Sequence, residues 1–165
     1  MTTVTWLDLT VYFLVYSFLG WAVEACYYAV TRKKFCNRGF LTLPFLPSYG
    51  LTYCLLTLAL PPLAGSYVLQ FGMTLVVAAV VESLSELFMS RACKKLRLDP
   101  ERGSLFNGSW QGLLISAGKA LCFYLVYLVF HPMLMAVSLL LPPLAVRIVG
   151  GILLGLMALE SLAVL

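Results

Sequence analysis

Charged side chains inside long apolar stretches are the residues of this sequence whose type and spacing could do chemistry. Glu24 and Glu82 lie in separate apolar runs, eight and nine residues before the next basic residue, and Lys119 lies in a third run. Glu86 follows Glu82 by four residues, a spacing that places both on the same face of a helix. Such groups are expensive in hydrocarbon, so they form ion pairs, bind cations or protons, or line a path for a polar solute.

The composition places these charges in a membrane protein. The chain has 165 residues, of which 62% are hydrophobic and only 11% are charged, whereas soluble globular proteins are about 45–50% apolar and about 25% charged. A domain of this size buries only about 70% of the surface that its unfolded chain exposes. The polar residues needed to cover the remainder are missing. A soluble enzyme, a disordered chain and a free nucleic-acid-binding domain are therefore excluded.

The apolar runs predict the elements that position the charges. A helix that crosses a bilayer needs about 20 mainly apolar residues, and five segments reach this length: residues 9–30, 41–60, 67–89, 112–130 and 145–165. The sequence therefore predicts an all-α fold, a polytopic membrane helix bundle of about five transmembrane helices in a single domain, residues 1–165. Residues 132–141 are apolar but short, so we expect them to be interfacial or re-entrant, with His131 and Pro132 ending the fourth span.

Basic residues predict the orientation of these spans. Four of the eleven Lys and Arg residues lie between the first two spans, and five lie between the third and fourth. Cytoplasmic loops carry an excess of Lys and Arg, so we expect the amino terminus outside and the carboxyl terminus inside, in a multi-pass protein of the cell membrane. Helix arithmetic then places Glu24, Glu82 and Lys119 in the cytoplasmic half of the bundle.

Two interpretations of the charges remain open from the residues alone. In one, Lys119 pairs with one or two glutamates and holds the bundle together. In the other, the charges line a cavity open to the cytosol that binds a cation, a proton or a polar substrate. A single Lys119 cannot neutralise all three carboxylates, so at least one must be protonated, hydrated or matched by another cation. The predicted substrate- or ion-binding residues are Glu24, Glu82, Glu86 and Lys119.

The second predicted span is interrupted by prolines at its start. The segment reads FLTLPFLPSYG and contains Pro44, Pro47 and Gly50. Irregular backbone at membrane depth is tolerated only where it is buried in protein or lines a water-filled cavity, and interrupted helices form binding sites in transporters. The alternative is a kinked helix whose freed carbonyl groups are satisfied by Ser48 or Tyr49.

Several classes of catalytic and metal site are absent from the sequence. There is no Walker A pattern, no G-x-S-x-G and no H-E-x-x-H, and the five cysteines lack a metal-ligand spacing. We therefore predict no catalytic residues, no metal, no cofactor and no enzymatic activity. A membrane enzyme that acts on a lipid-linked substrate, with carboxylates as acid and base, is the least supported alternative.

Three stretches of the sequence resemble a known family. They are YSFLGWAVEACY (residues 16–27), FCNRGFLTLPFLPSYG (residues 35–50), and the third span with the LFNGSW segment that follows it (residues 105–110). They are similar to the ABC-transporter type IV family, a group of small, multi-spanning, permease-like bacterial membrane proteins. The resemblance covers nearly the whole chain and is specific in the first third. Two departures are Leu43, where the family usually has glycine, and LRLDPERG in place of W-D-Y-S.

The resemblance implies membrane transport in the bacterial inner membrane. So small a chain without a nucleotide site would need a separate ATPase subunit and would act as an oligomer in the lipid bilayer, with no nucleic-acid partner. The motif residues would shape the cytoplasmic entrance of the site: Asn37, Arg38, Gly39, Pro44, Pro47, Tyr49, Gly50 and Asn107. The alternative function is a non-transporting membrane scaffold or regulator that docks a cytosolic partner on its basic loops.

Overall fold

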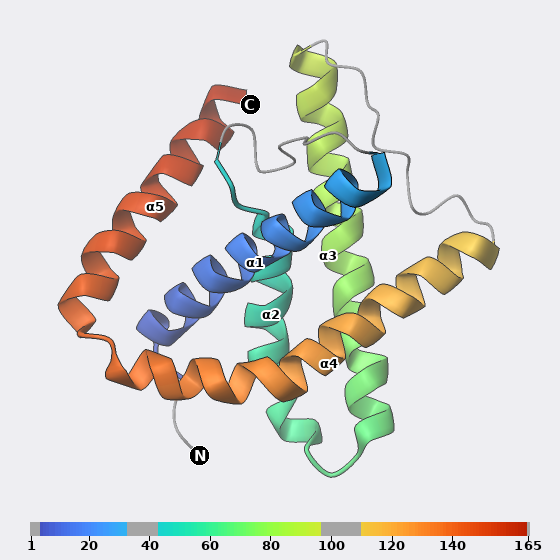
Figure 1. Ribbon diagram of the computed structural model, residues 1–165, viewed down its shortest axis with the longest axis horizontal. Helices are drawn as coiled ribbons and strands as arrows, with labels where there is room; N and C mark the ends of the chain where they lie inside the picture. The colour runs from blue at the N-terminus through green and yellow to red at the C-terminus, as the bar shows by residue number, and fades with distance from the viewer. Residues whose placement is uncertain (1–3, 33–42, 97–109, 165) are drawn as a thin grey trace. The chain divides into compact units, whose positions relative to one another are not determined.

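The computed structural model describes residues 4–32, 43–96 and 110–164, which are helical apart from short connections and contain no strand. The elements, drawn in Figure 1, are α1 (Trp6–Arg32), α2 (Pro47–Ala59), the short 3-10 helix η1 (Pro61–Leu63), α3 (Tyr67–Leu96), α4 (Trp110–Leu140) and α5 (Pro143–Val164). The predicted all-α class is therefore confirmed for this part of the chain.

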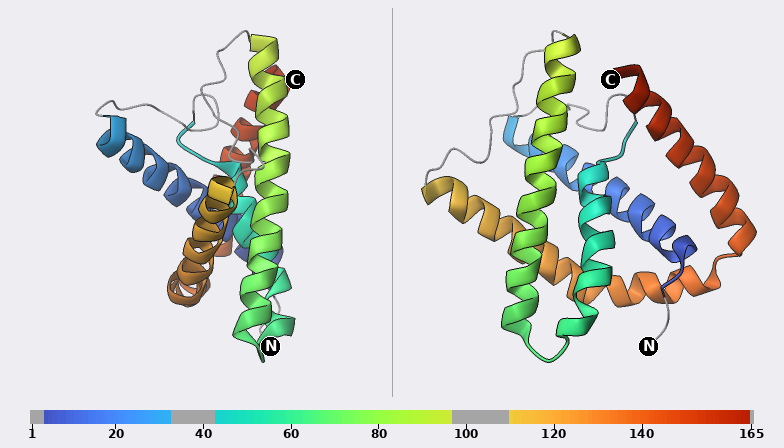
Figure 2. Two further views of the ribbon diagram at one scale, coloured as in Figure 1. Left: turned by 90° about the vertical axis from the view of Figure 1, so that its right-hand side faces the viewer. Right: turned by 180° about the vertical axis from the view of Figure 1, so that it is seen from behind.

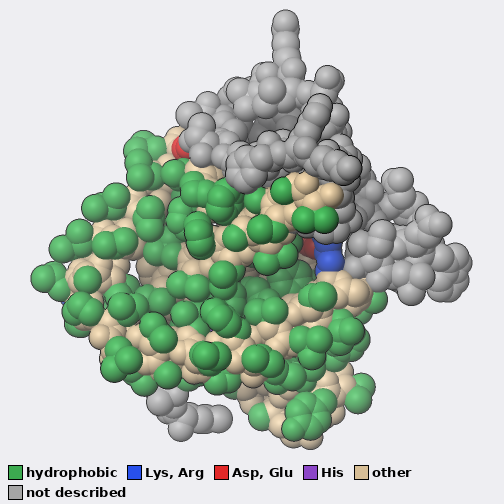
Figure 3. Space-filling view, in the orientation of Figure 1, with side chains coloured by type: hydrophobic (Ala, Val, Ile, Leu, Met, Phe, Trp, Pro, Cys, Tyr) green, Lys and Arg blue, Asp and Glu red, His purple; other side chains and the backbone are tan. Residues whose placement is uncertain are grey.

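Four of the helices are long and apolar enough to cross a membrane. Their apolar windows are Trp6–Cys26, Tyr67–Ser85, Ala117–Leu140 and Pro143–Glu160. At most 33% of any window is buried inside the protein, so most residues of these windows are at least partly uncovered by the rest of the chain. Figure 3 shows apolar side chains over most of the visible surface of the described residues. Helices of this kind are solvated by lipid acyl chains rather than by water.

Helix α2 is shorter than the predicted second span. Its 13 residues extend about 20 Å, whereas the apolar core of a bilayer is about 30 Å thick. The helix begins at Pro47, and the residues from Leu43 to Leu46 are not helical. Proline is well tolerated as the first helical residue because its missing N–H would have no partner there. The predicted interruption is thus a delayed helix start and not a kink within a helix.

Helix α4 corrects the prediction for the fourth span. We expected His131 and Pro132 to end the helix and residues 132–141 to be interfacial or re-entrant, but α4 continues unbroken through Pro132 to Leu140 (Figure 2). A proline removes one backbone donor, yet membrane helices tolerate it where neighbouring groups satisfy the freed carbonyl. The fourth helix is therefore longer than the span of residues 112–130 that was predicted from hydropathy and the position of the proline.

The chain divides into two compact units. The first comprises Met1–Cys54 and Met133–Ala163, and the second comprises Leu55–Pro132 with the last two residues. The first unit thus holds α1, the start of α2, the end of α4 and nearly all of α5, whereas the second holds the end of α2, η1, α3 and most of α4. Each unit is considered by itself below.

The first unit is built around α1. Thr5 and Asp8 cap its amino-terminal end, because Asp8 Oδ2 accepts hydrogen bonds from the Thr5 backbone N–H at 2.9 Å and from the Thr5 hydroxyl at 2.6 Å. Further along, the rings of Tyr16 and Tyr53 stack with their centroids 3.8 Å apart, and both side chains are buried. This stacked pair joins α1 to α2.

Candidate functional site

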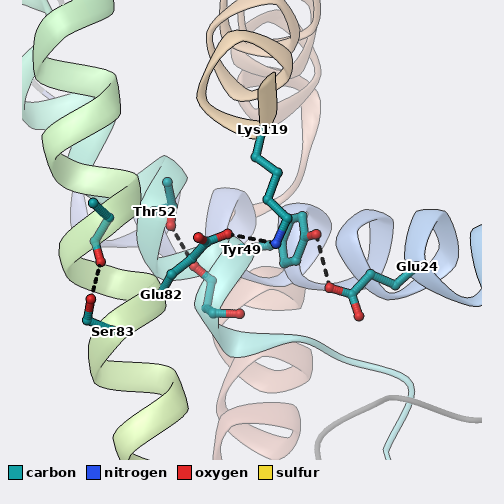
Figure 4. A network of polar contacts seen from close by, with 8 residues as sticks. Glu24, Tyr49, Thr52, Glu82, Ser83 and Lys119 are labelled. Atoms are coloured by element: carbon teal, nitrogen blue, oxygen red, sulfur yellow. Dashed lines mark hydrogen bonds and ion pairs between the residues drawn. The ribbon is translucent and has the colours of Figure 1, made fainter. Parts of the chain in front are cut away.

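An ion pair joins α3 to α4 in the second unit. Lys119 Nζ lies 3.0 Å from Glu82 Oε1, and the Lys119 and Glu82 side chains are 32% and 21% exposed. In Figure 4 the ammonium group points directly at this carboxylate. Both residues lie inside apolar windows long enough to cross a membrane. The charge of Glu82 is therefore balanced by a cation of the same unit.

One face of α3 leads to Glu82. Gln70, Thr74 and Ala78 precede it at intervals of four residues, and these three are buried. Residues four apart lie above one another on a helix, so the buried face continues directly to the glutamate. The position of Glu82 follows from the packing of this face.

A buried hydrogen bond fixes α4 against that face. The Tyr124 hydroxyl donates to Gln70 Oε1 at 2.8 Å, and Gln70 Nε2 donates to the Leu63 carbonyl oxygen of η1 at 3.2 Å. The ring of Phe71 also meets the Tyr124 ring edge-on, with centroids 6.1 Å apart. Tyr124 follows Lys119 by five residues, so two contacts on consecutive turns of α4, this one and the ion pair, join it to α3.

Sequence analysis did not identify Gln70 or Tyr124. The signal that was available is the spacing of Gln70, Thr74 and Glu82 by four and eight residues, which marks a polar stripe on one face of an otherwise apolar helix. Interhelical hydrogen bonds of such side chains hold membrane helices together.

A second acidic residue is held in the first unit by a neutral donor. The Tyr49 hydroxyl of α2 donates a hydrogen bond to Glu24 Oε1 of α1 at 3.1 Å (Figure 4). Glu24 lies in the apolar window of α1 and is half-buried. A tyrosine hydroxyl carries no charge at neutral pH, so this contact orients the carboxylate without balancing its charge.

Gly20 makes the contact between Tyr49 and Glu24 possible. A Cβ atom at Gly20 would overlap the ring of Tyr49, so the ring lies directly against the α1 backbone. Glu24 follows Gly20 by one helical turn, about 6 Å along the axis, which a tyrosine side chain can span. Only a residue without a side chain at position 20 lets the hydroxyl reach the carboxylate in this way.

The start of α2 is attached to α1 by backbone contacts. The Phe45 N–H donates to the Leu43 carbonyl at 2.9 Å, a tight turn around Pro44, and the Leu46 N–H donates to the Ser17 carbonyl of α1, also at 2.9 Å. At Gly50 an added Cβ would overlap the Ser17 hydroxyl. The proline segment is therefore packed on α1.

A comparison with known protein families identifies one that matches this chain. The family described as "Putative ABC-transporter type IV" matches residues 11–165. The chain belongs to this family. No curated protein and no solved structure matches the chain at a significant level.

The matched region of this ABC-transporter type IV member includes every helix from Val11 onwards. The resemblance seen in the sequence is thus confirmed over nearly the whole chain. Together with the four apolar helices, membership of a family with this description indicates a multi-pass membrane protein of the transporter type. A permease activity and a location in a particular membrane are finer statements, which are taken up below as proposals.

The structure accounts for some of the predicted site residues. It pairs Glu82 with Lys119 in the second unit and joins Glu24 to Tyr49 in the first. Two predicted entrance residues, Tyr49 and Gly50, pack against α1, and Pro47 is the first residue of α2. The expected role of these residues and of Pro44 at a cytoplasmic entrance stays a prediction. A cavity shared by all the charged residues also stays a prediction.

Other predicted residues lie outside the description. Glu86 belongs to α3, but its side chain is not among those described. Four further predicted residues belong to the two basic loops and lie outside the described residues altogether: Asn37, Arg38, Gly39 and Asn107. Within the described ranges, no group of three or more His, Cys, Asp or Glu residues could hold a metal ion.

Proposed function

We propose that this ABC-transporter type IV member is a permease-like transport protein of the bacterial inner membrane, with a polar binding site in the cytoplasmic half of its helices. The observation that carries the proposal is the ion pair of Lys119 with Glu82, at 3.0 Å, between two helices that are apolar enough to cross a membrane. Ionisable residues inside such helices are rare and mark substrate or ion pathways.

The exposure of the pair supports a binding role over a purely structural one. About a third of the Lys119 side chain and a fifth of the Glu82 side chain are accessible. A pair that only holds helices together gains most when it is sealed and fully hydrogen-bonded. We propose that water, and not lipid, covers the exposed part of the pair, so that a polar solute reaches the charges from one side of α3 and α4.

The orientation and the energy source belong to the same proposal. The basic loops favour the cytoplasm as the side from which the pair is reached. Because the sequence has no Walker A motif, ATP hydrolysis would come from a separate ATPase subunit. A second copy of the chain would complete a transport path too large for one short bundle.

Cysteine labelling tests whether water reaches the ion pair. In a cysteine-free variant of the full chain, Ala79→Cys places a thiol one turn before Glu82 on the same side of α3, and Val80→Cys is the matched control. Val80 lies at almost the same depth on the opposite side and is 52% exposed in the protein, so lipid covers it. In inverted membrane vesicles, a charged, membrane-impermeant thiol reagent should label Ala79→Cys at least tenfold faster than Val80→Cys.

The control separates the possible outcomes of this experiment. Equal labelling at both positions would show general access and contradict a directed polar path. Labelling at neither position would make the ion pair structural. In that case, one stoichiometric partner that copurifies with the chain, and dissociates on charge reversal of Lys94 and Lys95, would favour the scaffold or regulator.

A further inference from the structure

We propose that Glu24, held by Tyr49, binds the protonated amine of a cationic substrate. This inference rests on the proposed transport function and assigns a substrate class to it. The ligand would carry an ammonium group with at least one N–H, and it would reach Glu24 while the residue remains hydrogen-bonded to Tyr49.

Glu24 has no cationic partner within the described part of the first unit. Its hydrogen bond comes from the neutral Tyr49 hydroxyl. A carboxylate in an apolar helix needs a compensating cation, a proton or water. Within the described part of the first unit, a ligand that carries a cation would be a suitable partner for this carboxyl group.

The protein itself neutralises another carboxylate inside an apolar helix, that of Glu82, with an ammonium group. In the second unit, Glu82 receives the primary ammonium group of Lys119 at 3.0 Å. A charge-assisted hydrogen bond of this type is about twice as strong as a neutral one. The same chemistry, supplied by a ligand instead of a side chain, would satisfy Glu24.

The orientation of the Glu24 carboxylate is set by Tyr49. Tyr49 donates to Oε1, and the Tyr49 ring is itself held against Gly20. This arrangement orients the carboxylate, and among the described residues Oε2 accepts no hydrogen bond, so we assign it as the acceptor for an incoming N–H. A preoriented acceptor binds more tightly because less conformational freedom is lost on binding.

The other acidic residue of α1 shows the contrast. Asp8 also lies in the apolar window, but its Oδ2 accepts two hydrogen bonds from Thr5 at the amino-terminal end of the helix. The partial positive charge of a helix amino terminus stabilises a carboxylate in that position. Asp8 is therefore satisfied by its own helix, and it serves as the matched control.

Thermal stability of the purified full chain in lipid nanodiscs tests the inference at pH 7. Methylammonium chloride is the probe, and potassium chloride and tetramethylammonium chloride at equal ionic strength are the controls. Saturating methylammonium should raise the unfolding midpoint by about 3 °C, whereas neither control salt should do so. Glu24→Gln should remove the shift, and Asp8→Asn should keep it.

Tyr49→Phe gives a second, graded readout. Loss of the hydroxyl leaves Glu24 in place but frees its carboxylate, so the dissociation constant for methylammonium should rise about tenfold, equivalent to about 1.4 kcal/mol. If Glu24→Gln does not fold, this variant decides the question, and an unchanged dissociation constant would overturn the inference.

Other results would also overturn it. These are an equal shift with tetramethylammonium or potassium, an unaltered shift in Glu24→Gln, or no shift with methylammonium at all. None of them bears on the labelling of Ala79→Cys, so the substrate class can fail while the transport function stands.

Discussion

At the scale of single residues, two glutamates in apolar helices are stabilised in different ways. Glu82 faces the ammonium group of Lys119, whereas Glu24 faces the neutral hydroxyl of Tyr49. An ion pair in a low-dielectric environment is costly to break by removing one partner, because the remaining charge is left without compensation. A hydrogen bond from a neutral group stabilises a carboxylate less. The two sites should therefore respond differently to substitution.

Substitution of Lys119 tests the ion pair directly. Lys119→Met should lower the free energy of unfolding by about 1–3 kcal/mol, since the Glu82 carboxylate then lacks its partner. The double variant with Glu82→Gln should recover most of this loss, because no charge remains. Denaturant titration in mild detergent measures both values. A double variant that is no more stable than Lys119→Met alone would argue against the pair as drawn in the second unit.

At the scale of helices, the contact of α1 with α2 depends on two glycines. Gly20 accommodates the Tyr49 ring, and Gly50 brings α2 close to Ser17. Small residues let membrane helices approach closely enough for backbone and side-chain contacts. This contact sets the direction of the Tyr49 hydroxyl and, through it, the orientation of Glu24.

Gly20→Ala tests this packing with a built-in control. The added methyl group would overlap the Tyr49 ring, so the variant should be destabilised by about 1–3 kcal/mol, although alanine normally favours helix over glycine. In Gly151→Ala on α5, nothing described lies within 4 Å of the new Cβ, so stability should be unchanged or slightly higher. Thermal unfolding of both variants gives the comparison, and equal effects would disprove the close approach at Gly20.

The sequence was sufficient to predict the apolar helices and the charges within them, because both follow from composition and hydropathy. The pairing of Lys119 with Glu82 was one of two interpretations left open. The contact of Tyr49 with Glu24 was not predicted, since it depends on the ring lying against Gly20, which no periodicity reveals. The continuation of α4 through Pro132 was predicted wrongly, because a proline ends a helix only if the surroundings do not satisfy the freed carbonyl.

At the scale of the whole molecule, the topology states on which side of the bilayer the ends of the four apolar helices and of the short α2 lie. The predicted topology has five crossings, in which the basic loops after α1 and α3 would lie on one side of the membrane and α2 would cross together with the segment around Pro44. The positive-inside rule makes that side the cytoplasm.

Topology reporters test this arrangement. A fluorescent protein that folds only in the cytoplasm, fused after Leu165, should be bright, and alkaline phosphatase at the same position should be inactive. A cysteine introduced at Thr3 should react with an impermeant reagent in intact cells whose outer membrane has been made permeable. A fluorescent fusion that stays dark, with active phosphatase, would reverse the orientation and move the ion pair to the outer half.

The length of α4 has a further consequence. Its apolar window of 24 residues extends about 36 Å, which exceeds a hydrocarbon thickness of about 30 Å. A helix of this length is accommodated by tilting or by local thickening of the bilayer around it. Lysine 119 lies near one end of that window, so longer or shorter acyl chains would draw its ammonium group toward the lipid or toward the headgroups. We therefore expect the strength of the Lys119–Glu82 ion pair to depend on bilayer thickness.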